Sequence, residues 1–143
     1  MPLKRKIPID LEHLCSAFED DRSVLEYYLD LETGAILHTS EWDPEEAPLR
    51  IEQLEEECDR YLPIPYLTSD ESYQIMVDFI EIIANKKLKR SLTLAIAGKG
   101  AFTRFKNVLY EYQVERECWF KFKKEKVVDK VLEWLREMEI GIL

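Results

Sequence analysis

The sequence predicts an α+β fold, in which a small antiparallel β-hairpin or sheet packs against five or six helices. Apolar residues alternate from Leu25 to Leu31 before a glycine turn, and residues 35–39 can return as the second strand, so residues 23–39 are typical of a hairpin. Apolar residues recur at helical spacing over residues 69–84, which we expect to form the central helix. Further helical patterns fill most of the chain beyond residue 85.

Length and composition indicate a single globular domain over residues 1–143. Of these residues 46% are hydrophobic and 34% are charged, which suits a chain with a buried core. No apolar run approaches the roughly 18 residues of a membrane span, and no signal-peptide pattern follows the basic N-terminus. The three cysteines have no metal-ligand spacing, so we expect free thiols, a cytoplasmic location and no membrane partner.

The N-terminal part is expected to hold an arm, a helix and the hairpin. Residues 1–8 are expected to form a flexible arm, and Asp10 to cap a helix over about residues 11–20, because its carboxylate can accept free backbone N–H groups. In the hairpin, Gly34 can supply the positive φ of the turn. The face that carries Glu26, Tyr28 and Asp30 could be solvated or could meet another strand.

The middle of the chain is acidic and then proline-rich. Residues 41–59 carry nine carboxylates, which we interpret as a loop followed by a solvated helix face beginning near residue 49. Their spacing lacks the alternating ligands and central glycine of a calcium loop, so no metal site is predicted. Residues 61–66 are expected to be extended, because a residue that precedes proline avoids the α region.

The C-terminal part is expected to be helical. Thr68 and Glu71 form a capping box at the start of the central helix, which is expected to end before Asn85. The next helix should end at Gly98, as its C′ residue in left-handed conformation, and another should begin at Gly100. We expect a polar break over residues 111–116, a last helix over about residues 116–139, and an apolar tail.

The most basic stretch of the chain surrounds these two glycines. Residues 86–110 contain seven Lys or Arg and no acid, in a protein of net charge −9. Glycines let backbone amides approach a ligand, and free N–H groups at a helix start favour anions. The candidate ligand-binding residues for a phosphate, a nucleotide or a nucleic acid are therefore Gly98, Lys99, Gly100, Arg104 and Lys106.

Two structural alternatives stand beside this anion site. The glycines could simply turn a helix corner, and the acidic residues 1–85, of balance −15, could neutralise residues 86–143, of balance +6. Nucleic-acid binding would also need exposed aromatic side chains, whereas helical spacing predicts that Phe102 and Phe105 are buried.

No catalytic motif is present. The two histidines, His13 and His38, have no catalytic spacing, and no nucleophile or metalloprotease signature occurs. A carboxylate mechanism would depend on spatial proximity that the sequence does not display. We predict no catalytic residue and no cofactor, and we interpret the chain as a non-enzymatic binding module. The alternative is a protein-interaction or adaptor domain that uses the acidic residues 41–59 or exposed aromatic side chains.

The order of these features resembles a family of small uncharacterised bacterial proteins, UPF0158. The resemblance covers about residues 24–142 and is most specific at Gly98-Lys99-Gly100-Ala101-Phe102, followed by Arg104, Phe105, Lys106 and Leu109. It implies a bacterial cytosolic protein of mixed α and β structure, and it implies no catalytic residues.

Overall fold

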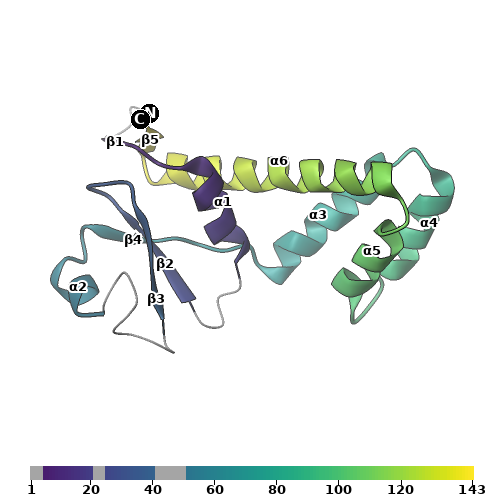
Figure 1. Cartoon of the computed structure of the whole chain (residues 1–143), viewed down its shortest axis with the longest axis horizontal. Helices are drawn as coiled ribbons and strands as arrows, with labels where there is room; N and C mark the ends of the chain where they lie inside the picture. Colours follow the sequence, from purple (N-terminus) through teal and green to yellow (C-terminus); the bar gives the residue numbers. More distant parts are fainter. Residues whose placement is uncertain (1–4, 21–24, 41–50) are drawn as a thin grey trace. The chain divides into compact units, whose positions relative to one another are not determined.

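The computed structural model describes residues 5–20, 25–40 and 51–143 (Figure 1). These residues form six helices, a three-stranded antiparallel sheet and a two-stranded parallel pair, which confirms the α+β class. The chain divides into two compact units, residues 1–67 with 127–143 and residues 68–126. That these units form a single domain stays a prediction.

The first unit contains the predicted hairpin. Strands β2 (Leu25–Asp30) and β3 (Ile36–Ser40) pair antiparallel, and β4 (Tyr61–Pro63) pairs antiparallel with the other edge of β2. The predicted extended segment after residue 60 thus becomes a strand, and β2 is the central strand of the sheet. The turn includes Gly34, whose φ of 81° confirms its predicted role.

The face of β2 that the sequence left undecided changes along the strand: Glu26 is exposed, Tyr28 is half-buried and Asp30 is buried, while β4 pairs with an edge of β2. Asp30 is 3% exposed, and its two carboxylate oxygens accept hydrogen bonds from Arg60 Nε at 3.0 Å and Nη2 at 2.9 Å. The backbone N–H of Glu32 donates to the same carboxylate at 2.9 Å. Asp30 therefore joins the hairpin turn to the residue that precedes β4.

A second strand pair uses residues from both ends of the described chain. Strand β1 (Arg5–Ile7), which the sequence placed in a flexible arm, pairs parallel with β5 (Ile140–Ile142), which it placed in an apolar tail. Figure 1 shows the two strands side by side. Residues 5–7 are therefore ordered by pairing, and residues 1–4 lie outside the described residues.

The core of the first unit lies among these elements and two helices. Helix α1 (Leu11–Glu19) begins as predicted, because the Asp10 carboxylate accepts a hydrogen bond from His13 N–H. Helix α6 (Gln113–Glu137) belongs to both units, and its residues from Val127 onward enter this core. The most deeply buried members of the core are Leu14, Leu29, Val127 and Val131.

The second unit is a helical assembly. It contains α3 (Ser69–Ile82), α4 (Lys86–Ala95), α5 (Ala101–Leu109) and the first half of α6. Both sides of the Thr68–Glu71 capping box are formed, as predicted. Its core is an aromatic cluster with ring centroids 4.7–6.4 Å apart, made by Phe79, Phe105, Trp119 and Phe122.

Several predicted boundaries need correction. Helix α3 ends at Ile82 rather than near residue 84, and α6 begins at Gln113 inside the segment expected to be a polar break. Asn85 is the N-cap of α4 and accepts a hydrogen bond from Leu88 N–H at 3.1 Å. Of the acidic segment, helix α2 (Ile51–Glu56) is present, whereas residues 41–50 lie outside the described residues.

Two classes of feature are absent from the part of the chain that the structure describes. None of its helices is long and apolar enough to cross a membrane. Within the same residues, no group of three or more His, Cys, Asp or Glu side chains could hold a metal ion.

Candidate functional site

The predicted anion site lies at the turn between α4 and α5. Gly98 and Gly100 both have positive φ, 80° and 78°. Gly100 is the N-cap of α5, as expected. Gly98 lies one residue further from α4 than predicted, because Ile96 is the C-cap and Ala97 occupies the C′ position. Gly98 therefore has the expected left-handed conformation, Gly100 has the expected place at the start of α5, and the corner is one residue longer than expected.

The side chain of Arg104, on α5, stabilises this turn by hydrogen bonds to backbone carbonyls. Its Nε donates to the carbonyl of Ala95 at 2.7 Å, and its Nη2 donates to Ala97 at 2.6 Å. Its Nη1 donates to the carbonyl of Lys99. These carbonyls belong to the end of α4 and the loop after it, where backbone acceptors lack helical partners. Most N–H groups of this guanidinium therefore donate to carbonyls of the same chain.

The structure brings four of the five predicted residues together and separates the fifth. Gly98, Lys99 and Gly100 form the turn, and Arg104 lies against it. Lys99 is exposed at the turn. Lys106 instead lines a pocket beside Phe102 and Phe105, and none of the other four predicted residues lines that pocket. Ligand binding by these five residues as one cluster stays a prediction.

The pocket that includes Lys106 has a volume of about 440 Å³ and belongs entirely to the second unit. Its floor is apolar, with Ile75 and Met76 of α3, Leu109 of α5 and Trp119 of α6. Its cations are Lys106, Arg116 and Lys123, and Ser72 adds a hydroxyl. Within residues 5–20, 25–40 and 51–143, no Asp or Glu lines this pocket.

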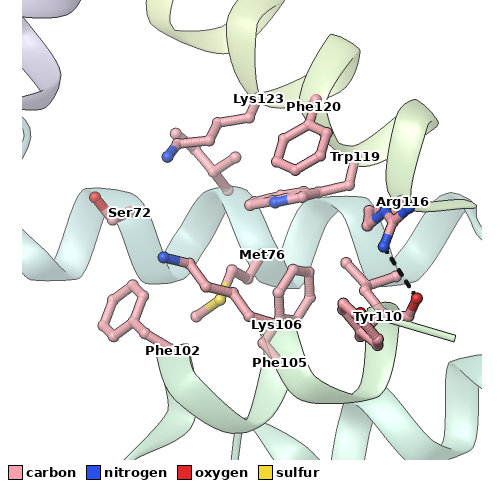
Figure 2. Close-up of a pocket in the computed structure, with 12 residues that line it drawn as sticks. Ser72, Met76, Phe102, Phe105, Lys106, Tyr110, Arg116, Trp119, Phe120 and Lys123 are labelled. Atoms are coloured by element: carbon pink, nitrogen blue, oxygen red, sulfur yellow. Dashed lines mark hydrogen bonds between the residues drawn. The ribbon is translucent and has the colours of Figure 1, made fainter. Parts of the chain in front are cut away.

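Aromatic and basic side chains surround the floor from two helices. Figure 2 shows Phe102, Lys106 and Tyr110 along one helix and Arg116, Phe120 and Lys123 along another. In this view the amino groups of Lys106 and Lys123 lie toward the side of Ser72, and Arg116 lies at the opposite side beside Tyr110. Arg116 Nη1 donates to the Tyr110 carbonyl at 3.0 Å, and its guanidinium lies 5.5 Å from the Tyr110 ring centroid.

The exposure of Phe102 corrects a prediction. Phe105 is 1% exposed, as expected, but Phe102 is 42% exposed and faces the pocket. Helical spacing placed both rings on one apolar face, because residues three apart lie near each other on a helix. In the structure α3 and α6 cover Phe105 fully and leave Phe102 at the edge of the covered area.

Sequence reasoning missed the contribution of α6 to this pocket. Arg116, Phe120 and Lys123 are spaced by four and three residues, which places them on one helix face. That spacing was the available signal. The expected helix over about residues 116–139 already contained all three residues, but nothing local in the sequence indicated that their face borders a pocket.

A second concavity, of about 330 Å³, lies in the first unit around Arg60. Acidic side chains dominate its lining, with Glu32, Glu56, Glu57 and Asp59. Arg60 is bound there by Asp30 and lies 3.5 Å from Glu32 and 3.6 Å from Glu57, so its pKa is raised. Its charge is already compensated, and we place no anion site there.

Comparison with known proteins shows the family to which this chain belongs. The model of the Uncharacterised protein family (UPF0158) matches residues 4–143. A UPF0158 protein of Pseudomonas aeruginosa is 30% identical over 136 residues, which cover 95% of this chain and 86% of that protein. UPF0158 proteins of Chlamydia muridarum and Chlamydia trachomatis are each 33% identical over 125 residues, which cover 86% of this chain.

The same alignments cover only 38% of each chlamydial protein. No solved structure matches the chain. The family match extends over nearly all of the sequence and confirms the resemblance that the order of sequence features indicated. The chain belongs to the uncharacterised protein family UPF0158.

Proposed function

We propose that this chain is a non-enzymatic binding module for a phosphate-bearing ligand or a nucleic acid, and that the pocket lined by Lys106, Arg116 and Lys123 is its binding site. The observation that carries the proposal is the charge of this pocket. Among the residues that the structure describes, three cations and no carboxylate line it, in a chain whose net charge is −9. Such a local excess of positive charge favours an anionic occupant.

The apolar floor supports the same ligand class. A cleft with charges of one sign and low-dielectric walls focuses the field on its occupant. Phe105 and Trp119 are buried in the floor and supply such walls. The volume of about 440 Å³ lies within the usual range of small-ligand pockets. An anion with an apolar or planar part would use both the cations and the floor.

The predicted turn is a second electropositive feature of the same helix. Ala101 begins α5, and the backbone N–H groups of a first helical turn have no helical acceptor. Lys99 adds an exposed charge beside them. Because α5 carries the turn at its start and Lys106 further along, one extended polyanion could use both places.

The test is a binding titration with inorganic tripolyphosphate, at low and at moderate salt. We expect binding that weakens with salt, because a phosphate contact releases counterions. The double variant Lys106→Ala/Lys123→Ala should lose at least about tenfold in affinity, if each contact contributes on the order of 1 kcal/mol. Absence of binding at low salt would contradict the proposal.

Two further variants locate the binding. Lys86→Ala/Lys87→Ala removes the same charge from exposed positions that do not line the pocket, and it should bind nearly as the parent does. Lys99→Ala removes the exposed charge of the turn without changing a residue that lines the pocket. Its affinity therefore shows whether the turn contributes to binding. Equal losses in both double variants would indicate attraction by net charge alone, without a specific site.

A protein-interaction role is the second candidate, favoured by the exposed aromatic side chains of the same unit. Tyr110 is 74% exposed and Phe120 is 62% exposed. Burial of such rings against a partner protein would depend little on salt, whereas phosphate binding falls steeply with salt. Salt dependence therefore distinguishes the two candidates.

A further inference from the structure

Aromatic and basic side chains alternate along both helices that border the pocket. On α5 the order is Phe102, Lys106 and Tyr110, and on α6 it is Arg116, Phe120 and Lys123. Steps of three or four residues keep each set on one helix face and separate its members by about 4.5–6 Å along the axis. Two such faces border one pocket (Figure 2).

The aromatic rings at the edge are accessible, unlike those of the floor. Phe102, Tyr110 and Phe120 are all exposed by more than a third, whereas Phe105 and Trp119 are buried in the aromatic cluster. The outer rings therefore retain surface that the core does not cover. Arg116 also restrains the Tyr110 segment, through its hydrogen bond to the carbonyl and its position over the ring.

We propose that the occupant is single-stranded nucleic acid, whose bases stack on Phe102 and Phe120 while its phosphates contact Lys106 and Lys123. This inference rests on the proposed function and names its ligand class. Proteins that bind single strands combine a positive groove with aromatic side chains on which successive bases stack. Both components are present here and alternate along the direction that a strand would follow.

The repeated pattern argues for a strand over simpler anions. A free phosphate would use the cations and leave three exposed rings without a role. A duplex keeps its bases stacked inside the helix, so its contacts would be with phosphates and sugars. An acidic peptide would satisfy the cations but offers no row of planar groups. An unpaired strand supplies charge and planar surface in alternation.

The experiment compares four labelled or competing polyanions on the intact chain. These are a single-stranded oligonucleotide of about 12 nucleotides, its matched duplex, inorganic polyphosphate and polyglutamate, with anisotropy of the labelled strand as the readout. We expect the single strand to bind at least about tenfold more tightly than each of the others. Equal affinity of polyglutamate or of the duplex would overturn the inference.

Variants test the stacking directly. Phe120→Leu keeps an apolar side chain and removes the aromatic face, so single-strand affinity should fall about tenfold, at the lower end of the loss for one stacked base. Polyphosphate affinity should stay unchanged. Phe102→Leu should act in the same way, and Tyr66→Leu, which removes a half-exposed ring of the other unit, is the matched control.

The outcomes separate this inference from the proposed function. If polyphosphate binds and Lys106→Ala weakens it, but Phe120→Leu leaves single-strand affinity unchanged, the stacking inference is wrong and the anion site stands. If neither polyphosphate nor oligonucleotide binds at low salt, both are wrong. Circular-dichroism melting of each variant verifies that it folds; Phe120 is largely exposed, so we expect little loss of stability on its replacement.

Discussion

Gly34 and Gly98 have nearly the same backbone conformation, with φ of 81° and 80°, in different surroundings. A Cβ atom on Gly34 would lie 2.0 Å from the carbonyl oxygen of Pro8. A Cβ atom on Gly98 would meet nothing within 4 Å. Gly34 is therefore required both by its φ and by the close approach of another backbone segment, and Gly98 by its φ alone.

This difference predicts unequal effects of alanine. Gly98→Ala should lower the free energy of unfolding by about 1 kcal/mol, the usual strain of a left-handed alanine. Gly34→Ala should lower it by roughly 3 kcal/mol, because the Pro8 backbone must also move. Urea denaturation of each variant measures its loss in the free energy of unfolding. Equal losses would contradict the contact between Gly34 and Pro8.

Asp30 couples stability to pH. Burial raises the pKa of its carboxyl, but hydrogen bonds from Arg60, Glu32 and Thr33 lower it more, to about 2. The ordinary value is 3.8, so the folded state binds the proton less tightly than the unfolded state. The resulting stabilisation is present above pH 3.8 and disappears as the pH falls from 3.8 toward 2.

Asp30→Asn should therefore change the acid side of the stability profile. Because water at the partly exposed Arg60 screens the interaction, we expect a pH-dependent contribution on the order of 1 kcal/mol. The parent should lose this amount relative to the variant between pH 5 and pH 2, in denaturation curves at several pH values. Parallel profiles of parent and variant would contradict the assignment.

At the scale of the element, the end of α4 shows how helices of the second unit are joined. The carbonyl of Ile96 accepts a hydrogen bond from the Tyr73 hydroxyl at 2.9 Å, and the carbonyls of Ala95 and Ala97 accept from Arg104. Side chains of α3 and α5 thus satisfy acceptors that a helix end leaves open. The positive charge of Arg104 also suits the negative end of the helix dipole.

Replacement of Arg104 tests this cap. Arg104→Lys keeps the charge but loses the planar fork that reaches several carbonyls at once, so we expect roughly 1–2 kcal/mol of destabilisation. Arg90→Lys, at an exposed position of α4, should change stability by less than about 0.5 kcal/mol. Thermal unfolding measures both. Equal stability of the two variants would show that the contacts of Arg104 add little.

At the scale of the whole molecule, the two compact units have different cores and different surface chemistry. The first unit packs residues of its strands, α1 and the end of α6 around Leu14 and Leu29, and its core includes the aromatic pair Phe18 and Trp134. The second unit packs aromatic rings and carries the basic pocket. The division of charge between the acidic first 85 residues and the basic remainder therefore has a local counterpart, a pocket without carboxylates.

Much of the fold was predictable because its signals are local. The capping box at Thr68, the Asp10 cap and the positive φ of Gly34 each depend on a few neighbouring residues, so the sequence displays them directly. Periodicity likewise predicted the hairpin and the helices, because one buried face repeats at the period of its own element. The sequence by itself determined the α+β class and these elements.

Tertiary structure decided which residues meet. The pairing of β1 with β5, the Asp30–Arg60 bond and the exposure of Phe102 all depend on segments distant in sequence. Arg104 looked like a ligand-binding cation, yet the end of α4 supplies its acceptors. The residues next to a cation do not show whether its side chain will face solvent or a backbone carbonyl. That depends on which other segment of the folded chain lies beside it.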